Sequence, residues 1–490
     1  MSTQANPTRV LVLGCGSVAQ CVIPLLIRDL KIATSAITIV DFVDNRHRVA
    51  DAIKQGVKYE IGQVTRENLD SFLAERLAAG DILLDLAWNI DCPTILEWCR
   101  MRGVRYLNTS VELWDPYYDM AKTHPLDRTL YVRHQSIRKM VAKWGSNKGP
   151  SAVVEHGANP GLVSHFAKQA LFEISNKILN DGRAGSRQSA IESALASESF
   201  DRLAMLTGTR VIHISERDTQ ITNQPKEVNE FVNTWSVEGF YEEGVAPAEM
   251  GWGTHERWMP ANAQVHADDG PCNQICLAQP GMETWVRSWV PSGEILGMII
   301  RHGESYTMSN HLTVRDDSGK AIYRPTVHYS YCPSNEAINS VLELRMRNWQ
   351  KQPKERIMNN EIISGRDELG VLLLGHDYTG WWTGTRLSID EARSIVDGQS
   401  ATTLQVAGSV IAAVKWMIAS PNEGVCVPDD LPWKSVLADA RPYIGEIHSA
   451  PTDWDPLKTR NDLFPGFGNT GRLDTTDPWQ FRNFLTPTPS

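Results

Sequence analysis

The chain has 490 residues, of which 42% are hydrophobic and 22% are charged, an ordinary composition for a folded protein of two or three domains. Its net charge of −10 argues against nucleic acid and against an anionic membrane surface as partners. The first residues lack the basic-then-apolar pattern of a secretion signal, so we expect a cytoplasmic protein.

The first 41 residues have the pattern of a dinucleotide-binding unit. A short apolar strand at residues 10–13 leads into a glycine-rich turn and a helix, and a second apolar run follows. The glycines allow a tight turn and a close approach of the backbone to a pyrophosphate, whose charge a helix N-terminus favours. The predicted pyrophosphate-binding residues are Gly14, Gly16, Ser17 and Val18.

The acidic residue that ends the second apolar run favours one dinucleotide over the other. Asp41 stands where a carboxylate binds the ribose hydroxyls of NAD and repels the 2′-phosphate of NADP. Arg46 and Arg48 follow closely enough to leave NADP open. The sequence therefore predicts a nicotinamide dinucleotide as cofactor, with a preference for NAD.

Strands and helices continue to alternate up to residue 155. Expected strands cover residues 57–61, 81–87, 104–108 and 151–155, and expected helices cover 66–79 and 92–102. This alternation predicts an α/β fold with a doubly wound parallel Rossmann sheet, whose ligands bind at the carboxyl ends of the strands. The residues expected beside the cofactor at these ends are Asn89, Asp91, Asn108, Thr109, Glu112, Ala158 and Asn159.

From about residue 160 the regular alternation stops. We expect a helix from Leu162, an exposed polar loop at 178–190, and strands at 210–215, 283–290, 297–301, 305–308 and 327–331, which indicate a second, mixed or antiparallel sheet. The chain returns to helix at a capping-box pattern from Ser388 and in a buried core helix at 401–418.

These elements predict three domains. They are a Rossmann domain over residues 1–155, a second α+β domain for substrate and dimerisation over 156–385, and a helical C-terminal segment with an extended tail over 386–490. We expect this last segment to pack back on the Rossmann domain.

The eight cysteines are scattered along the chain, several in apolar runs, as is typical of reduced thiols. Cys272 and Cys276 are the only close pair with polar residues between them. No second cysteine pair or histidine pair completes a zinc-binding set, so we expect no metal.

Acidic residues gather between residues 216 and 256. Nine carboxylates in this stretch are offset by Arg217 and Lys226 alone, and tryptophan, phenylalanine and tyrosine residues are interleaved with them. A solvated face is the ordinary explanation of an acidic run. Carboxylates walled by aromatic rings also suit a small polyamine, because cation–π attraction contributes about 0.5–2 kcal/mol. An anionic substrate would need an Arg or Lys cluster here, so the sequence favours a nicotinamide-dependent enzyme that acts on a cationic amine.

At this point the chain resembles the bacterial homospermidine synthase family. The similar segments are residues 156–171, 213–220, 231–240, 248–260, 324–331, 367–373 and 477–483, and the front domain is similar more broadly to saccharopine-dehydrogenase-type proteins. The resemblance implies a homodimeric transferase that moves an aminobutyl group between two putrescine molecules and releases ammonia. It also implies that NAD is reduced and reoxidised within one catalytic cycle.

The resemblance implies roles for four residues of the second domain. Glu216 and Glu243 would bind substrate amines, and Glu216 would also be a candidate for proton transfer. Trp235 would place its ring face against a cationic intermediate, and His302 would line the pocket. Each has an ordinary alternative as well: a core tryptophan, a solvated glutamate or a structural histidine.

In the first domain, Glu112 and Asn159 would lie near the nicotinamide and the reacting carbon. Where the family carries an acid after the fourth strand, this chain has Asn89 and Asp91, and the sequence leaves open which of them takes that position.

Two other functions stay open at this stage. One is a saccharopine-, opine- or carboxyspermidine-type reductase that uses free NAD(P)H and binds carboxylates through Arg or Lys. The other is a nucleotide-binding regulator without catalysis, which has no use for a pocket of acids and aromatic rings.

Overall fold

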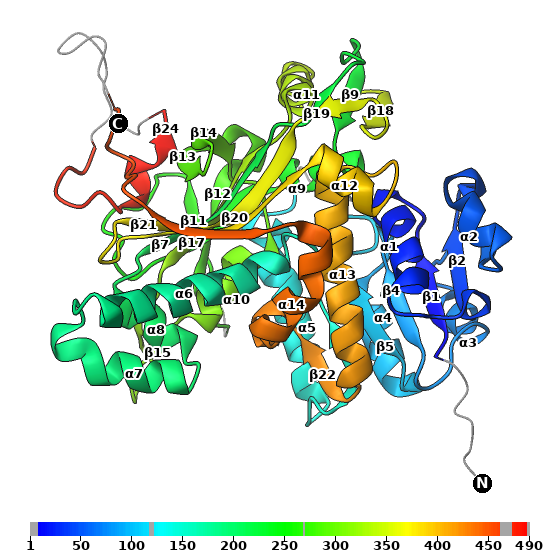
Figure 1. Ribbon diagram of the computed structural model, residues 1–490, viewed down its shortest axis with the longest axis horizontal. Helices are drawn as coiled ribbons and strands as arrows, with labels where there is room; N and C mark the ends of the chain where they lie inside the picture. Colours follow the sequence, from blue (N-terminus) through cyan, green and yellow to red (C-terminus); the bar gives the residue numbers. More distant parts are fainter. Residues whose placement is uncertain (1–7, 117–121, 268–269, 461–472, 488–490) are drawn as a thin grey trace. The chain divides into compact units, whose positions relative to one another are not determined.

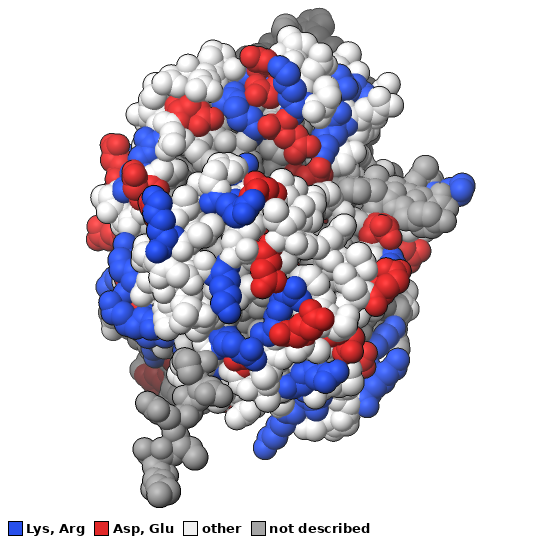
Figure 2. All heavy atoms as spheres, turned by 90° about the vertical axis from the view of Figure 1, so that its right-hand side faces the viewer, with Lys and Arg blue, Asp and Glu red and all other residues white. Residues whose placement is uncertain are grey.

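The computed structural model describes residues 8–116, 122–267, 270–460 and 473–487 (Figure 1). The chain divides into two compact units. Unit 1 comprises residues 1–121, 133–162 and 390–444, and unit 2 comprises 122–132, 163–389 and 445–490. On the face drawn in Figure 2, basic and acidic side chains are interspersed, so the net charge of −10 is not gathered there.

Unit 1 is built on a seven-stranded sheet. Its strands are β1 (Val10–Leu13), β2 (Ile37–Asp41), β3 (Lys58–Ile61), β4 (Ile82–Asp85), β5 (Arg105–Asn108), β6 (Gly149–Val153) and β22 (Glu423–Cys426). All pair in parallel, in the order β22-β6-β5-β4-β1-β2-β3. The order runs outward from β1 in both directions, which confirms the doubly wound sheet.

The helices of this part of the chain are α1 (Ser17–Arg28), α2 (Ala50–Lys54), α3 (Leu69–Ala74), α4 (Cys92–Arg102), α5 (Leu130–Lys143), α12 (Ile389–Ile395), α13 (Ala401–Ala419) and α14 (Trp433–Ile444). Strands β1, β4 and β5 are buried along their whole length, as parallel strands covered on both faces should be. Helix α13 is long and apolar enough to cross a membrane by composition, but 78% of its apolar window is buried within the protein. This confirms the buried core helix expected at 401–418.

Unit 2 is built on an eleven-stranded mixed sheet. Its strands are β7 (Val211–Asp218), β10 (Pro247–Gly251), β11 (Ala263–Val265), β12 (Gln274–Pro280), β13 (Trp285–Val290), β14 (Gly293–Met298), β17 (Thr326–Cys332), β20 (Arg366–Leu374), β21 (Gly380–Ser388), β23 (Ile447–Thr452) and β24 (Leu485–Thr486). The main path is β11-β12-β10-β17-β7-β20-β21-β23, while β14 branches from β17 and carries β13 and β24. Strands β7 and β17 pair in parallel, and the other pairs of this sheet are antiparallel.

Three small two-stranded sheets complete the strands of unit 2: β8 (Ile221–Thr222) with β19 (Ile362–Ser364), β9 (Glu230–Asn233) with β18 (Lys354–Ile357), and β15 (Val314–Arg315) with β16 (Ala321–Tyr323). The helices are α6 (Leu162–Asn180), α7 (Gln188–Ala196), α8 (Phe200–Thr207), α9 (Val237–Val245), α10 (Gly303–His311) and α11 (Asn335–Met346).

Two expectations of local structure are wrong in this unit. Residues 305–308 lie in helix α10, not in a strand, and residues 303–309 are all buried. A helix that is buried on nearly every face shows no amphipathic pattern, so periodicity could not identify it. The loop expected at 178–190 is confined to residues 181–184. Helix α6 runs to Asn180 with Ile178 fully buried, and a 3₁₀ helix, η4 (Gly185–Arg187), leads directly into α7 at Gln188.

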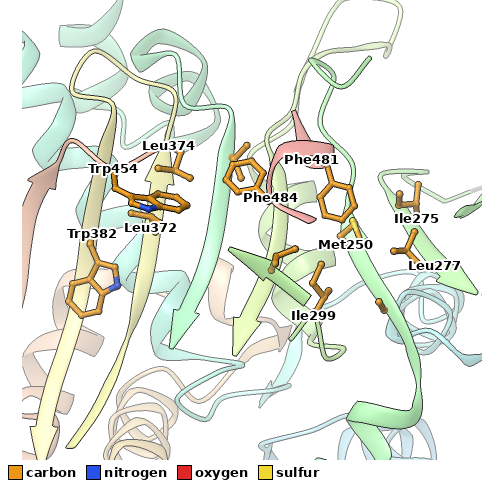
Figure 3. Close-up of a cluster of buried hydrophobic side chains, with 13 residues drawn as sticks. Met250, Ile275, Leu277, Ile299, Leu372, Leu374, Trp382, Trp454, Phe481 and Phe484 are labelled. Carbon is orange, nitrogen blue, oxygen red and sulfur yellow. The ribbon is translucent and has the colours of Figure 1, made fainter. Parts of the chain in front are cut away.

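The C-terminal segment is divided between the units, whereas the sequence led us to expect a helical segment over 386–490 that packs back on the Rossmann domain and ends in an extended tail. Residues 390–444 belong to unit 1 and residues 445–490 to unit 2. Strand β23 pairs with β21, and Phe481 and Phe484 lie in the buried cluster of unit 2 (Figure 3). Apolar burial of these two rings explains why the end of the chain joins the second sheet.

Replacing Phe484 by Ala is expected to destabilise the protein by about 3–5 kcal/mol, because the ring is fully buried and its loss leaves a cavity. Urea unfolding of the cofactor-free protein measures this change. The matched control is Phe42→Ala, since Phe42 is 55% exposed and its loss should stay within about 0.5 kcal/mol. Equal effects of the two substitutions would show that Phe484 is not part of the stabilising core.

Candidate active site

The turn between β1 and α1 has the geometry that a pyrophosphate requires. Gly14 has a φ of +85°, and a Cβ at this position would lie 2.8 Å from the carbonyl oxygen of Leu86. Nothing lies within 4 Å of a Cβ built on Gly16, so the space over the start of α1 is open. Ser17 and Val18 follow in the first turn, which has no side-chain cap and no acidic residue. The N–H groups and the positive dipole end of α1 therefore suit an anionic ligand.

Asp41 is fixed at the end of β2 beside this turn. Its Oδ2 accepts a hydrogen bond from the Cys15 backbone N–H at 2.7 Å, and its Oδ1 accepts one from the Val43 N–H at 2.9 Å. Arg46, one of the two arginines that left NADP open, forms an exposed ion pair with Asp44 at 2.5 Å. A fixed carboxylate at this edge suits ribose hydroxyls and disfavours a 2′-phosphate.

Further polar residues gather after β4, β5 and β6. The Asn89 backbone N–H lies 3.5 Å from Glu112 Oε2, and Glu112 Oε1 accepts a hydrogen bond from Ser110 Oγ at 2.8 Å. Asn108 joins the ends of β5 and β6, because its Oδ1 accepts a hydrogen bond from the Glu155 N–H at 2.7 Å. Thr109 is half-buried one residue past β5.

Ala158 and Asn159 lie in the loop that leads from β6 to α6, and Ala158 is buried while Asn159 is half-buried.

Unlike Asn89, whose backbone N–H lies near Glu112, Asp91 has its carboxylate bound within its own helix. It is the N-cap of α4, and its Oδ2 accepts hydrogen bonds from the Thr94 N–H at 3.0 Å and Thr94 Oγ1 at 2.6 Å. The role of N-cap is therefore a sufficient structural reason for an aspartate at position 91.

Asp85, the last residue of β4, is a buried acid that the sequence analysis missed. Tyr106 Oη donates a hydrogen bond to its Oδ2 at 2.8 Å, and burial raises the pKa of Asp85 from 3.8 to about 7. The sequence contained a signal, since a single aspartate stands within the apolar run at 81–87 next to the cofactor edge.

In unit 2, the predicted residues meet at the carboxyl ends of β7 and β17. Glu216 on β7 is 2% exposed and lies opposite Tyr331 of β17 in the parallel register. Tyr329 Oη donates a hydrogen bond to Glu216 Oε2, and the rings of Tyr329 and Tyr331 stack with centroids 5.3 Å apart. Burial raises the pKa of both tyrosines well above the ordinary value, so they remain phenols.

Trp235 extends this group of rings. Its Nε1 donates a hydrogen bond to Tyr331 Oη at 2.9 Å, and its ring centroid lies 5.5 Å from that of Phe240. Phe240 also meets Tyr331 edge to face at 5.5 Å. Trp235 is half-buried, while Phe240 is fully buried. The indole is therefore held by one hydrogen bond and by the rings of Phe240 and Tyr331, while part of its surface stays exposed.

His302 contacts the ring of Tyr329, and Glu243 lies beside His302. The His302 Nε2 atom is 3.8 Å from Glu243 Oε2, and the His302 ring meets Tyr329 edge to face at 4.3 Å. Next to them, Arg301 forms a buried ion pair with Glu242, which ties the end of α9 to the start of α10. Glu216, Trp235, Glu243 and His302 therefore form one group with the two tyrosines, which we call the acid–aromatic cluster.

The structure also separates the nine carboxylates of the 216–256 run into classes. Four of them form ion pairs with basic residues from later in the chain: Glu227 with Lys354, Glu230 with Arg356, Glu238 with Lys351, and Glu242 with Arg301. Three accept hydrogen bonds from buried or half-buried side chains: Asp218 from Thr234, Glu249 from Gln274, and Glu256 from Thr326. Glu216 and Glu243 are the two that belong to the acid–aromatic cluster.

The sequence analysis missed Tyr329 and Tyr331 as parts of the site. Their spacing of two residues in a strand puts both rings on one face, and this signal was present within the segment 324–331. The predicted site residues as a whole form two groups, one in each unit. A search of the described residues finds no group of three or more His, Cys, Asp or Glu side chains that could hold a metal ion.

Comparison with known proteins covers nearly the whole chain. Family models for the saccharopine dehydrogenase NADP binding domain and the saccharopine dehydrogenase C-terminal domain match residues 10–153 and 157–452. Homospermidine synthase of Blastochloris viridis is 40% identical over 97% of both chains. The enzyme of Mesorhizobium japonicum is 38% identical over 97% of this chain and 96% of its own. The crystal structure of homospermidine synthase from Legionella pneumophila in complex with NAD is 36% identical, covers 98% of both chains and has a TM-score of 0.85.

The raised pKa of Asp85 predicts a pH dependence of stability with a definite sign. The folded protein keeps a proton on Asp85 up to about pH 7, whereas the unfolded chain releases it near the ordinary pKa of 3.8. The free energy of unfolding should therefore fall as pH rises between these values, by roughly 4 kcal/mol in total.

Asp85→Asn removes this titration, so the variant should gain stability relative to the wild type across that pH window. Urea unfolding of the cofactor-free proteins from pH 4 to pH 8 measures the difference. Asp317→Asn, at an exposed position, should follow the wild-type profile. Parallel profiles of the wild type and Asp85→Asn would mean that Asp85 is ionised in the folded protein.

Proposed function

This chain belongs to the homospermidine synthase family, of the saccharopine dehydrogenase type, and we propose that it transfers an aminobutyl group between two putrescine molecules. In this reaction one amine carbon is oxidised to an imine and the amine of a second putrescine replaces its nitrogen, which leaves as ammonia. Reduction of the resulting Schiff base gives homospermidine, so the net reaction is redox-neutral. The observation that carries the proposal is the buried pairing of Glu216 with Tyr329, beside the half-buried ring of Trp235.

NAD is the cofactor of this proposal, and it supplies the hydride acceptor and donor for the two redox steps when it is bound. The turn from Gly14 to Val18 would hold its pyrophosphate, and Asp41 would hold its adenosine ribose. The open space over Gly16 and the two backbone hydrogen bonds that fix Asp41 support this assignment. The preference for NAD over NADP rests on the carboxylate of Asp41.

Glu216 and Glu243 bind the substrate ammonium groups in this proposal. A charge-assisted hydrogen bond to a buried carboxylate is about twice as strong as a neutral one. Tyr329 donates to one oxygen of Glu216, which stabilises the carboxylate form that an ammonium group requires. Glu216 also accepts the proton that the amine must lose before its carbon is oxidised. His302, between Glu243 and Tyr329, orients both of these side chains.

Trp235 stabilises the cationic imine through its ring face. A carboxylate at this place would take up the iminium proton and leave a neutral imine, which accepts a hydride poorly. An indole attracts the cation without accepting its proton. The hydrogen bond from Trp235 Nε1 to Tyr331 fixes the plane of the ring.

In unit 1, Glu112, Asn108, Thr109, Ala158 and Asn159 would lie near the nicotinamide of the bound cofactor. Asn89 is the residue that we assign to the position after the fourth strand, because the carboxylate of Asp91 caps α4. A homodimeric assembly and a cytoplasmic location are parts of the same proposal.

The fate of the hydride tests this function. Putrescine deuterated at both carbons next to nitrogen, incubated with substoichiometric NAD⁺, should give homospermidine that retains the transferred deuterium. Excess unlabelled NADH in solution should not dilute the label, and no net absorbance of NADH should accumulate. Complete loss of the label to solution NADH would exclude the bound-cofactor scheme, and stoichiometric NADH formation would indicate an ordinary dehydrogenase.

Substitutions at Trp235 test the role of the ring face. Trp235→Phe should retain most of the turnover number, because phenylalanine keeps a weaker aromatic face. The turnover number of Trp235→Leu should fall about tenfold to hundredfold, because a cation–π attraction of about 2 kcal/mol is lost. The control is Trp289→Leu, a half-buried tryptophan of β13, which should keep a near-normal turnover number well below its melting temperature. Equal activity of the Phe and Leu variants would make Trp235 a packing residue.

A further inference from the structure

A cavity lies in unit 2, away from the acid–aromatic cluster. It has a volume of about 320 Å³, and its charged lining consists of Arg210, Arg257, Arg324 and Asp477. We call it the arginine pocket. Three guanidinium groups around one carboxylate give its wall an excess of positive charge.

Arg324 is the buried member of this lining, with 9% of its surface exposed. Its Nε donates a hydrogen bond to Thr313 Oγ1 at 3.1 Å and its Nη1 donates one to the Trp252 carbonyl oxygen at 3.4 Å. Both acceptors are neutral, and no carboxylate of the described residues lies within 4 Å of its guanidinium nitrogens. Burial lowers the pKa of Arg324 to about 10, so the group is still a cation at neutral pH. A buried cation without a counter-ion is costly unless an anion joins it.

The two other arginines form the rim of the pocket. Arg210 lies 2.8 Å from Asp477 and Arg257 lies 3.8 Å from the same oxygen, while Arg257 also forms an ion pair with Asp474 at 2.6 Å. Their side chains are 45% and 54% exposed, so a ligand from solution can reach them. Rearrangement of such exposed ion pairs costs little, because each contributes about 1 kcal/mol or less.

The arginine pocket is separate from the proposed amine site on the same two strands. Arg210 immediately precedes β7 and Arg324 lies two residues before β17, whereas Glu216 and Tyr331 lie near the other ends of these strands. The six residue steps from Arg210 to Glu216 span about 20 Å of extended chain. A diamine would be repelled by three guanidinium groups, so this pocket does not serve the proposed substrate.

We propose that the arginine pocket binds a small phosphate-bearing anion, with Arg324 at its base and Arg210 and Arg257 at its rim. The planar guanidinium fork matches phosphate oxygens in a bidentate way, and several arginines around one cavity are typical of phosphate recognition. The cavity has the volume of a small-molecule site. The proposal does not depend on the reaction proposed above, because it uses residues outside the acid–aromatic cluster.

Isothermal titration of the full chain tests this site. Inorganic phosphate, pyrophosphate and AMP are titrated separately at constant ionic strength, and the arginine variants below distinguish binding in this pocket from binding at the turn at Gly14. At least one of the three should bind with saturation, and the tightest of them identifies whether the source is a free phosphate, a diphosphate or a nucleotide. Arg324→Gln should weaken that binding at least tenfold. The matched control Arg366→Gln removes an exposed arginine of β20 outside the pocket and should leave the affinity unchanged.

A second variant keeps the test decisive if Arg324→Gln does not fold. Arg257→Gln changes a rim residue that is 54% exposed, so folding should be preserved and the affinity should fall severalfold. Absence of saturable binding of all three anions at millimolar concentrations would overturn the proposal. Equal loss of affinity in Arg257→Gln and Arg366→Gln would also overturn it, because the effect would then come from net charge alone.

Discussion

The parallel pairing of β7 with β17 is the constraint on which the site in unit 2 depends. It sets Glu216 opposite Tyr331 and brings the Tyr329 hydroxyl to the Glu216 carboxylate. A carboxylate that is 2% exposed would be costly without such a donor. Since a slip of one residue between the two strands would put Glu216 and the two tyrosines on opposite faces of the sheet, the register itself specifies the site.

The aromatic rings around this pair fill space and also hold neighbouring side chains in place. Tyr331 accepts the indole N–H of Trp235, and Tyr329 meets the ring of His302, which lies beside Glu243. Glu216, Trp235 and His302 thus each contact a tyrosine, and Glu243 joins the cluster through His302. Aromatic rings suit this purpose because they are rigid and exclude water, which strengthens every charge interaction near them.

Unit 1 uses backbone more than side chains for its proposed ligand. Glycines at the end of β1, a free helix start and a carboxylate held by two backbone N–H groups make up its cofactor edge. Side chains of this edge also have structural tasks. Asp91 caps α4, and Asn108 joins β5 to β6. In unit 2, the end of the chain provides comparable support, because Phe481 and Phe484 fill the core beside the central strands (Figure 3).

The sequence by itself was sufficient to predict the Rossmann unit, its glycine turn and the position of Asp41, because each of these follows from a local motif. It also named the four candidate site residues of the second domain, through segments that resemble the family. Tertiary structure alone decided which of the nine carboxylates join the cluster, because the bases that pair with four of the others come from residues 301–356. Tertiary contacts also account for the helix at residues 305–308 and for the division of the C-terminal segment between the units. They bring the Tyr329 hydroxyl to Glu216 as well. These features arise from contacts between residues far apart in the chain, and local periodicity carries no information about such contacts.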